Sequence, residues 1–325
     1  MQLTVNSRAF IEAEQYSQFI LTVLHDGLLP ESFWRNITDF ADGTNLHIKT
    51  VGTVTVQEAE EDAPLVYSPI ETGTIQFNIT QYTGDAWYVT DDLREDGAQI
   101  DTLMAQRSAE STRALQEKFE TDFLAVAGNY YQTNAGAPAN INGFPHFVVS
   151  AATGNVAKVN HFLRMKLAFD KAKVPDDGRV AIVDPVVAAT LNGYVSLTSN
   201  ITQFAKDLIE NGMARGMRFA WNLFGWDVIT SNRLPVGVWN DGTTTITNGV
   251  GNIFMCVLDD QTKPVMGAWR RMPKVEGERN KDRARDEYVV RSRYGFGIQR
   301  VDTLGCLATS PVNFLPDTTG EIVAV

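Results

Sequence analysis

The sequence predicts an α+β fold, and three features of the chain carry that prediction. Alternating apolar residues predict the two strands of a long β-ribbon between about residues 44 and 90. A long helix is expected directly afterwards, and most segments after residue 219 favour strands. With 325 residues, 44% hydrophobic and 21% charged, the chain has the composition of a folded globular protein of two or three compact units.

The N-terminal region contains a short amphipathic stretch from Phe10 to Leu24, which ends at Asp26-Gly27. A segment with one apolar face needs a surface to lie against, either in its own subunit or in a neighbouring one.

The ribbon is predicted from alternation at Leu46, Ile48, Val54 and Val56 and again over Ile75–Ile79. Its tip carries four acids in five residues, Glu58, Glu60, Glu61 and Asp62. An isolated ribbon is marginally stable in water because it has no third strand. Two interpretations remain open: the edge of a larger sheet, protected by its acids, or a contact between subunits.

The helix is expected from about Leu93 to Ala127, roughly 50 Å at 1.5 Å per residue. Asp92 and Glu95 resemble a capping box at its start, and Gly128-Asn129 is typical of a helix end. Apolar residues cluster near both ends, whereas Ser108, Ser111 and Thr112 occupy the same face between them. This pattern predicts a strut held at each end, with a long core helix of irregular pattern as the alternative.

The remaining chain alternates helices and strands. One helix is expected over Asn160–Ala172, with Phe162, Leu163, Leu167 and Ala168 on its buried side, and a second begins at Asp184-Pro185, where Asp is the cap. The other expectations are a buried strand at Val180–Val183, a helix at Ile201–Glu210, strands around Phe219–Thr230, a mobile surface loop at 237–252, a strand at Ile253–Leu258, a solvated charged loop at Glu276–Glu287, and strands at Tyr288–Tyr294, Phe296–Val301 and Leu304–Ala308.

The sequence carries no recognisable catalytic, phosphate-binding or metal-binding motif. The four histidines are far apart, and Cys256 and Cys306 lack metal-ligand spacing, which favours two reduced, partly buried thiols. We therefore predict no enzyme activity, no metal and no cofactor. A formal net charge of −11 argues against a nucleic-acid-binding protein, although a local basic patch would escape that argument. No signal peptide or membrane span is expected.

The order of these parts, together with several short motifs, resembles the major capsid proteins of tailed bacteriophages, which have the Hong Kong 97-type fold. The motifs are Val174-Pro175-Asp176-Asp177-Gly178-Arg179, Asp184-Pro185, Gly225-Trp226-Asp227-Val228, Ser231-Asn232-Arg233-Leu234-Pro235, and Tyr288-Val289-Val290 with Tyr294-Gly295-Phe296. The resemblance covers nearly the whole chain.

The resemblance implies an α+β Hong Kong 97-type capsid fold with five parts. They are an N-terminal arm (1–43), an extended β-hairpin loop (44–90), a peripheral domain with the spine helix (91–173), an axial domain (174–270), and a charged loop with return strands to the peripheral domain (271–325). In this family the ribbon and the arm lie on a neighbouring subunit, which would explain why both look unsupported within one chain.

The implied function is that of a viral structural protein, a bacteriophage capsid protein of the virion. It would self-assemble as a homo-oligomer, through hexamers and pentamers, into an icosahedral shell around double-stranded DNA bound without sequence specificity. Further partners implied are a portal protein, decoration proteins and a scaffolding protein, separate because the chain begins with Met1 almost at the arm. Assembly is expected in the host cytoplasm, without a membrane. Lys49, the ribbon's only lysine, lies in a strand, so no covalent cross-linking is predicted.

Contacts between subunits are expected at the charges of the ribbon tip and of the late charged loop, which would set the register between subunits. These residues are Glu58, Glu60, Glu61, Asp62, Arg279, Lys281, Arg283 and Arg285. Two other functions remain open. One is an encapsulin-like nanocompartment shell on the same fold, and the other is an α+β enzyme whose site is assembled from scattered carboxylates.

Overall fold

The computed structural model describes residues 29–37, 45–51, 72–96, 100–133, 140–197 and 219–313. The helical elements are η2 (Glu31–Phe33), α1 (Asp91–Asp96), α2 (Ile100–Thr133), η3 (Thr153–Asn155), α3 (Val159–Lys171) and α4 (Pro185–Leu197). The strands are β1 (Arg35–Asn36), β2 (Asn45–Val51), β3 (Thr72–Asn78), β4 (Gln81–Thr90), β5 (Asn140–Ile141), β6 (Phe144–Pro145), β7 (Phe147–Val149), β8 (Arg179–Val183), β9 (Phe219–Leu223), β10 (Trp226–Thr230), β11 (Val236–Asn240), β12 (Thr245–Cys256), β13 (Val265–Asn280), β14 (Arg285–Ile298) and β15 (Leu304–Thr309). The α+β class is confirmed.

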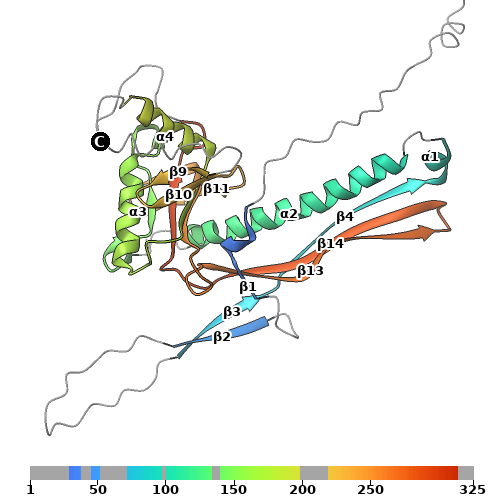
Figure 1. Ribbon diagram of the computed structural model, residues 1–325, viewed down its shortest axis with the longest axis horizontal. Helices are drawn as coiled ribbons and strands as arrows, with labels where there is room; N and C mark the ends of the chain where they lie inside the picture. The colour runs from blue at the N-terminus through green and yellow to red at the C-terminus, as the bar shows by residue number, and fades with distance from the viewer. Residues whose placement is uncertain are drawn as a thin grey trace, which may run out of the picture.

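A seven-stranded sheet forms the body at one end of the molecule, in the order β7-β15-β12-β8-β10-β9 with β11 paired to β12. All five residues of β8 are buried, as the apolar run Val180–Val183 predicts. Helices α3 and α4 pack on one face through residues such as Phe162 and Leu191. The C-terminal part of α2 covers the other face (Figure 1).

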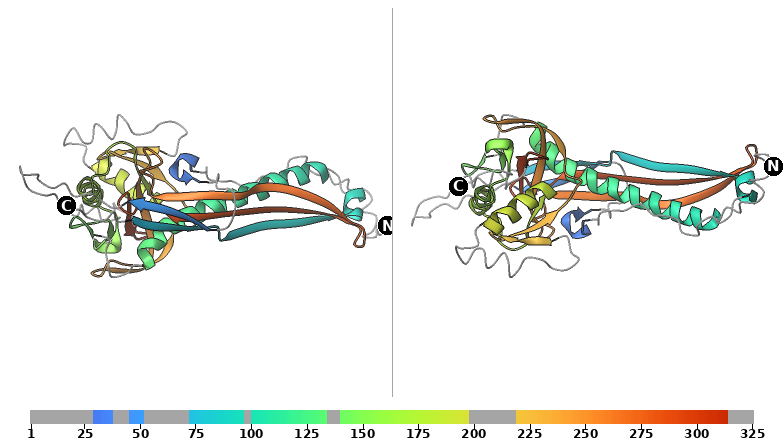
Figure 2. Two further views of the ribbon diagram at one scale, coloured as in Figure 1. Left: turned by 90° about the horizontal axis from the view of Figure 1, so that it is seen from below. Right: turned by 90° about the horizontal axis from the view of Figure 1, so that it is seen from above.

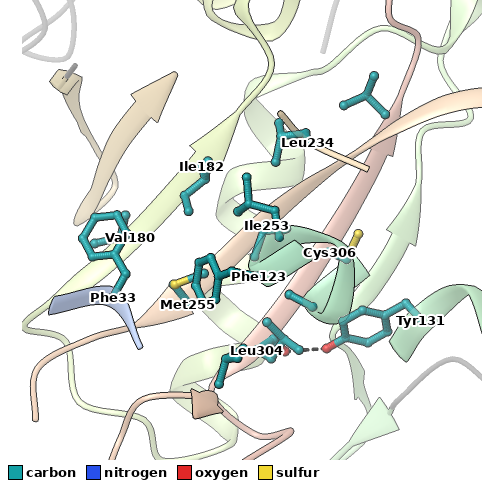
Figure 3. Close-up of a cluster of buried hydrophobic side chains, with 14 of the residues drawn as sticks. Phe33, Phe123, Tyr131, Val180, Ile182, Leu234, Ile253, Met255, Leu304 and Cys306 are labelled. Atoms are coloured by element: carbon teal, nitrogen blue, oxygen red, sulfur yellow. Dashed lines mark hydrogen bonds between the residues drawn. The ribbon is translucent and has the colours of Figure 1, made fainter. Parts of the chain in front are cut away.

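The core between α2 and this sheet is aromatic and aliphatic. Phe123 of α2 lies among Ile182, Ile253 and Met255 of the sheet (Figure 3). The hydroxyl of Tyr131, buried near the end of α2, donates a 2.6 Å hydrogen bond to the Leu304 carbonyl. The last turns of the helix are therefore fixed to the body by both packing and a satisfied polar group.

Helix α2 runs past the predicted end at Gly128-Asn129 and stops at Thr133. The glycine serves close packing instead of a helix stop, because a Cβ at Gly128 would lie 2.4 Å from Pro235 Cγ and 3.2 Å from the Trp239 ring. The predicted start is also corrected. Thr90 accepts the Leu93 N–H at the first turn of α1, so Asp92 is not the cap.

The strut prediction is wrong about which part of the helix is covered. Leu115, Phe119 and Leu124 are buried, and Ser111 in the middle is 1% exposed. Leu103, near the N-terminal end, is 48% exposed and lines a hollow of about 410 Å³ beside Trp87 and other residues. One chain thus buries α2 from its middle to its C-terminal end, where Ser111 donates a 2.6 Å hydrogen bond to Asp85, and leaves its N-terminal end more exposed.

A four-stranded sheet, β1-β13-β14-β4, runs along α2 and forms the elongated part of the molecule (Figures 1 and 2). The face toward the helix carries an aromatic cluster, in which Phe119 stacks on Trp269 at 4.1 Å and meets Tyr294 edge-on at 4.9 Å. Aromatic contacts of this kind add to the area they bury. On the opposite face, Phe77 and Ile79 at the end of β3 pack against Met266 and Ala268, and farther toward the β13–β14 turn no described element covers this face (Figure 2, left).

The charged segment Glu276–Glu287 is not a loop. Strands β13 and β14 extend through it and pair to their ends, with Asn280 opposite Arg285, leaving a turn of residues 281–284. Because the late apolar residues belong to the same strand, the two strands predicted at Tyr288–Tyr294 and Phe296–Val301 form the single strand β14. Charged residues occupy both faces of the strands here, so the alternation of apolar and polar residues that predicts a strand is absent from the sequence.

The predicted surface loop at 237–252 is also wrong, because β11 and β12 form an antiparallel hairpin there. Glycines let the strands approach the fully buried Trp239, whose ring would lie 2.4 Å from a Cβ at Gly251. The glycines of this segment therefore allow close packing against Trp239 and do not mark a surface loop. Helix α3 buries Met165 and Phe169 beside Phe162 and Ala168, whereas the predicted Leu163 and Leu167 are exposed.

Other predicted elements are confirmed. Asp184 caps α4 by accepting the Val186 N–H at 3.0 Å, directly before Pro185. Strands β2 and β3 form the predicted ribbon as a two-stranded antiparallel sheet with Ile48 opposite Ile75. The stretches Phe10–Leu24, Ile201–Glu210 and the ribbon tip lie outside the described residues.

Candidate assembly surfaces

The far end of the four-stranded sheet holds a network of charges from three elements. Arg279 of β13 donates two hydrogen bonds to the Asp91 carboxylate, one of 2.7 Å to Oδ2, and one of 3.2 Å to Asp286. Arg94 of α1 also pairs with Asp286. The network joins residues distant in sequence, so it fixes α1 to the end of the β13–β14 hairpin.

These contacts shift the acid–base properties of the network. The hydrogen bond from Arg279 lowers the pKa of Asp91 and outweighs the effect of partial desolvation. The pKa of Arg279 is raised by the same pair. Hydrogen bonds from Arg285 and Asn280 lower the pKa of Glu287. Arg285 also lies over the Tyr88 ring, 4.3 Å from its centroid.

The predicted contact residues therefore divide into three groups. Arg279 and Arg285 are partnered by acids of their own chain. Lys281 and Arg283 lie exposed in the turn between β13 and β14, and their side chains form no ion pair with the part of the chain that the structure describes. Glu58, Glu60, Glu61 and Asp62 lie outside the described residues.

A second polar cluster joins three parts of the chain at the base of the N-terminal segment. Glu120 of α2, 3% exposed, accepts the Leu29 N–H at 3.0 Å and pairs with Arg233 at 3.3 Å. Arg233 also bonds Glu117 at 3.0 Å. Beside it, Trp34 packs edge-on against Phe119 with ring centroids 5.2 Å apart. Residues 29–37 thus dock on their own subunit.

This cluster is not among the predicted contact residues. The sequence shows Arg233 only within the motif Ser231–Pro235, and a lone Glu120 in a helix gives no sign of burial. A buried carboxylate needs a cation and hydrogen-bond donors, which here come from residues 91 and 113 positions away in the chain. No local pattern contains that information.

The outer face of the four-stranded sheet, beyond the part that β3 covers, carries a second set of charges, which are not among the predicted contact residues. Lys274 lies directly opposite Arg291, and Arg271 lies opposite Arg293. The alternation of Arg291 and Arg293 around the buried Ser292 places both arginines on the outer face. The two-residue spacing of these arginines is visible in the sequence, and within a strand it indicates that both lie on one face.

The described residues contain no group of three or more histidine, cysteine or acidic side chains arranged to hold a metal ion. Cys256 and Cys306 are free and buried, as predicted, and burial raises the pKa of the Cys306 thiol. Burial lowers the pKa of His161 to about 4, with Arg164 and Lys158 adding to the effect. His161 Nδ1 accepts the Lys158 N–H, which gives this imidazole a structural position at the start of α3.

Within the same residues, no helix is both long enough and apolar enough to cross a membrane. What the geometry presents is an elongated subunit with a partly uncovered sheet face, a projecting two-stranded ribbon and clustered surface charges. These are features of a protein that binds other protein surfaces.

Solved structures with the same arrangement are shell proteins. The capsid protein of the cyanophage P-SCSP1u superposes with a TM-score of 0.69 at 16% identity, covering 92% of this chain and 93% of that one. The capsid of the native GTA particle gives 0.63 at 14% identity, covering 95% and 99%. The holo-SrpI encapsulin complex of Synechococcus elongatus gives 0.57 at 11% identity, covering 97% and 98%. A search of curated proteins found no match.

The fold is the Hong Kong 97-type capsid fold, as the resemblance implied. The family model described as "Phage capsid protein" matches residues 71–309, most of the chain. This chain belongs to that phage capsid protein family, and it is a major capsid protein.

Proposed function

We propose that this major capsid protein assembles as hexamers and pentamers into the closed icosahedral head of a tailed phage, which encloses double-stranded DNA without sequence specificity. The observation that carries the proposal is the ribbon β2–β3, which projects from the body with only two strands (Figure 1). A two-stranded ribbon gains stability by packing on another surface, and its direction leads away from its own sheets.

The five-part division by residue number remains part of this proposal, with the arm in 1–43, the ribbon in 44–90, the peripheral domain in 91–173, the axial domain in 174–270 and the return segment in 271–325. The ribbon and the part of the arm before residue 29 would lie on neighbouring subunits, whereas residues 29–37 pack on their own subunit. The ribbon acids Glu58, Glu60, Glu61 and Asp62 and the turn residues Lys281 and Arg283 would contribute charges at those contacts. Arg279 and Arg285 would contribute indirectly, by holding the hairpin end in shape.

Assembly would take place in the host cytoplasm and give a virion capsid. A separate scaffolding protein, a portal protein and decoration proteins are the partners expected for such a head, and the subunit itself would have a structural role without catalysis. The nanocompartment alternative is supported by the encapsulin among the similar structures. It would enclose an enzyme cargo in place of a genome.

Negative-stain electron microscopy and size-exclusion chromatography of the expressed protein, alone and with its neighbouring genes, test the proposal. Closed shells, tubes or clusters of hexamers and pentamers are expected. Nucleic acid inside the particles supports the phage head, whereas a protein cargo supports the nanocompartment. A monodisperse monomer or small oligomer under every condition contradicts both.

A deletion tests the ribbon contact separately. Removing Gln57–Pro64 should leave a folded subunit, because the deletion spares both described ribbon strands. We expect this variant to form no closed shells. Normal shells from the deleted protein would contradict the ribbon contact while leaving the capsid function intact.

A further inference from the structure

The outer face of the four-stranded sheet carries cations in an arrangement that costs its own subunit stability. Lys274 faces Arg291 across β13 and β14, and Arg271 faces Arg293 in the next row. Side chains directly opposite in an antiparallel pair lie about 5 Å apart, and like charges there repel each other. A chain with a net charge of −11 thus gathers four cations on one exposed surface.

Only one of the four is neutralised nearby. Arg271 donates a 2.6 Å hydrogen bond to Glu276. Lys274, Arg291 and Arg293, which we call the basic cluster, form no ion pair with any residue in the described ranges. Farther along the same strands, by contrast, Arg279 and Arg285 are both paired with acids of this subunit.

Beside strand β4, Lys274 and Arg291 of the basic cluster are exposed and Arg293 is half-buried. On the outer face, Gly84 of β4 lies opposite Arg291, and Tyr82 lies opposite Arg293. A Cβ at Gly84 would lie 3.3 Å from Arg291 Cγ, so the side chain of the arginine lies over the glycine. Tyr82 is 61% exposed. The end of β3 covers this face nearer the body, where Phe77 and Ile79 pack on Met266 and Ala268, and it stops short of the rows of the basic cluster (Figure 2, left).

The ligand that fits is a short acidic segment. Five extended residues span about 16 Å. A segment of that length fits the two rows of cations, whereas a long polymer would extend past them. The next positions toward the far end carry Glu276, Glu278 and Glu287. Arg271 and Arg285 pair with the first and the last of these acids, so Glu278 is the one that would repel a continuous phosphate backbone. A segment that ends before these acids avoids that repulsion.

The chain itself contains such a segment. Gln57–Pro64 carries Glu58, Glu60, Glu61 and Asp62, four acids in five residues. It belongs to the connection between Val51 of β2 and Thr72 of β3, the ends of the ribbon that lie away from the sheets (Figure 1). The described part of the ribbon therefore points away from its own basic cluster.

We propose that the basic cluster binds the acidic segment Gln57–Pro64 of a second copy of this chain. This inference rests on the proposed shell function and deepens it, because it assigns the acceptor of the ribbon tip. The acceptor is the uncovered part of the sheet face instead of the hairpin end, where the arginines already have partners. The repulsion within the basic cluster is relieved on binding, so the contact favours the assembled state.

Charge reversal and its compensation test the proposal. The variant K274E/R291E/R293E should lose at least 90% of the closed shells formed by the unaltered chain. Reversal of the tip, E58K/E60K/E61K/D62K, should cause a similar loss, and the combination of both sets should restore shells. The same tip reversal combined with K281E/R283E provides the matched control and should remain without shells. Rescue by that control in place of the first would overturn the assignment.

Folding of each variant is checked by circular dichroism and thermal unfolding of the unassembled subunit. Normal shells from K274E/R291E/R293E overturn the proposal, and normal shells with a reduced DNA content assign the basic cluster to packaged DNA instead. Disulfide trapping adds a direct readout. Cysteines at Glu60 and Arg291 should give covalent dimers, whereas a cross-link within one chain overturns the contact with a second copy.

A binding measurement separates this inference from the proposed function. A fluorescent peptide of residues 55–66 should bind the full-length subunit, and its Kd should rise at least tenfold for K274E/R291E/R293E and with added salt. This readout does not require shells. If the unaltered chain forms no shells but binds the peptide, the proposed function fails and the contact stands. If shells form but the peptide binds both proteins equally, the contact fails alone.

Discussion

The two large sheets of this subunit are stabilised in different ways. The seven-stranded sheet is covered on both faces, by α3 and α4 on one side and by α2 on the other, and every residue of β8 is buried. The four-stranded sheet is covered by α2 along one face, whereas on its other face the end of β3 packs against Met266 and Ala268 and leaves the rest without a described cover (Figure 2, left). The difference teaches that one sheet completes its own core, whereas the other leaves part of a face for another molecule.

The largest loss of stability is expected from a cavity in the core of the seven-stranded sheet. Phe254→Ala removes a fully buried ring that contacts Phe162 and Trp226, with centroids 5.2 and 5.0 Å apart. We expect a loss of about 3–5 kcal/mol in unfolding free energy. Tyr88→Ala on the outer face of the four-stranded sheet, 57% exposed, should cost less than about 1 kcal/mol. Denaturant unfolding of both variants measures the contrast, and equal losses would contradict it.

The next largest effect is expected where the two regions join. Arg233→Met leaves the buried Glu120 carboxylate without its cation, and we expect a loss of about 3 kcal/mol. Glu120→Gln combined with Arg233→Met should recover part of that loss, because the buried side chain at position 120 is then neutral and Glu117 keeps Arg113 as a partner. A double-mutant cycle in denaturant measures the coupling. Additive losses would show that the pair is not coupled.

Much of the fold could be predicted because its signals are local. The ribbon strands, the buried strand around Ile182 and the cap at Asp184 follow from alternation, apolar runs and turn chemistry. The failures are residues whose local signal serves a distant contact. Gly128 looked like a helix stop, and the glycines of 237–252 looked like a loop, but both lie against Trp239 or Pro235.

The substitution Gly128→Ala is expected to change the stability of the protein in the direction opposite to the usual one. Alanine is about 1 kcal/mol better than glycine within a helix, so Gly→Ala normally stabilises one. At position 128 the new Cβ would lie 2.4 Å from Pro235 Cγ, and we expect a net loss of about 1–2 kcal/mol. Thermal unfolding checks the direction. A raised Tm would show that α2 and the 235 segment separate easily.

A smaller effect sharpens the comparison within the four-stranded sheet itself. Arg291→Gln removes a cation from the repelling row with Lys274, so the unassembled subunit should gain about 0.2–1 kcal/mol. Arg279→Gln removes a cation paired with Asp91 and Asp286, so it should destabilise the hairpin end. The two arginines lie on one strand pair. Effects of the same sign in chemical unfolding would contradict the division between paired and unpaired cations.

The smallest expected effect is a pH dependence confined to the hairpin end. The pKa values of Asp91 and Glu287 are lowered by Arg279 and Arg285, so their contribution to stability is complete above the unfolded values of 3.8 and 4.5. It is lost as pH falls through the lower folded values. Hydrogen exchange of β13 and β14, corrected for intrinsic rates, should show local opening toward about pH 3. Arg279→Gln should remove the part of this dependence that comes from Asp91 and leave the part that comes from Glu287, whose partners are Arg285 and Asn280.

The candidate site was less predictable than the fold. Charge alone selected Arg279 and Arg285 as contact residues, yet the structure pairs both within the chain. Whether a charged side chain is free to contact another subunit depends on which strands lie beside it in the folded sheet. Asp91 is 188 residues from Arg279, and that separation is bridged only in the folded sheet. Arg291 and Arg293 had a visible spacing of two, but their position opposite Lys274 follows from strand register.

The topology of the four-stranded sheet also sets when a newly made chain acquires its surface. Strand β4 ends at Thr90, but its partner β14 begins at Arg285 and contains two of the three residues of the basic cluster. At about 5–20 residues per second, a ribosome completes β14 roughly 10–40 s after β4. Until then the acceptor surface does not exist. Nascent chains on one messenger would therefore be unable to capture each other's acidic segments, and the contact would be reserved for finished subunits.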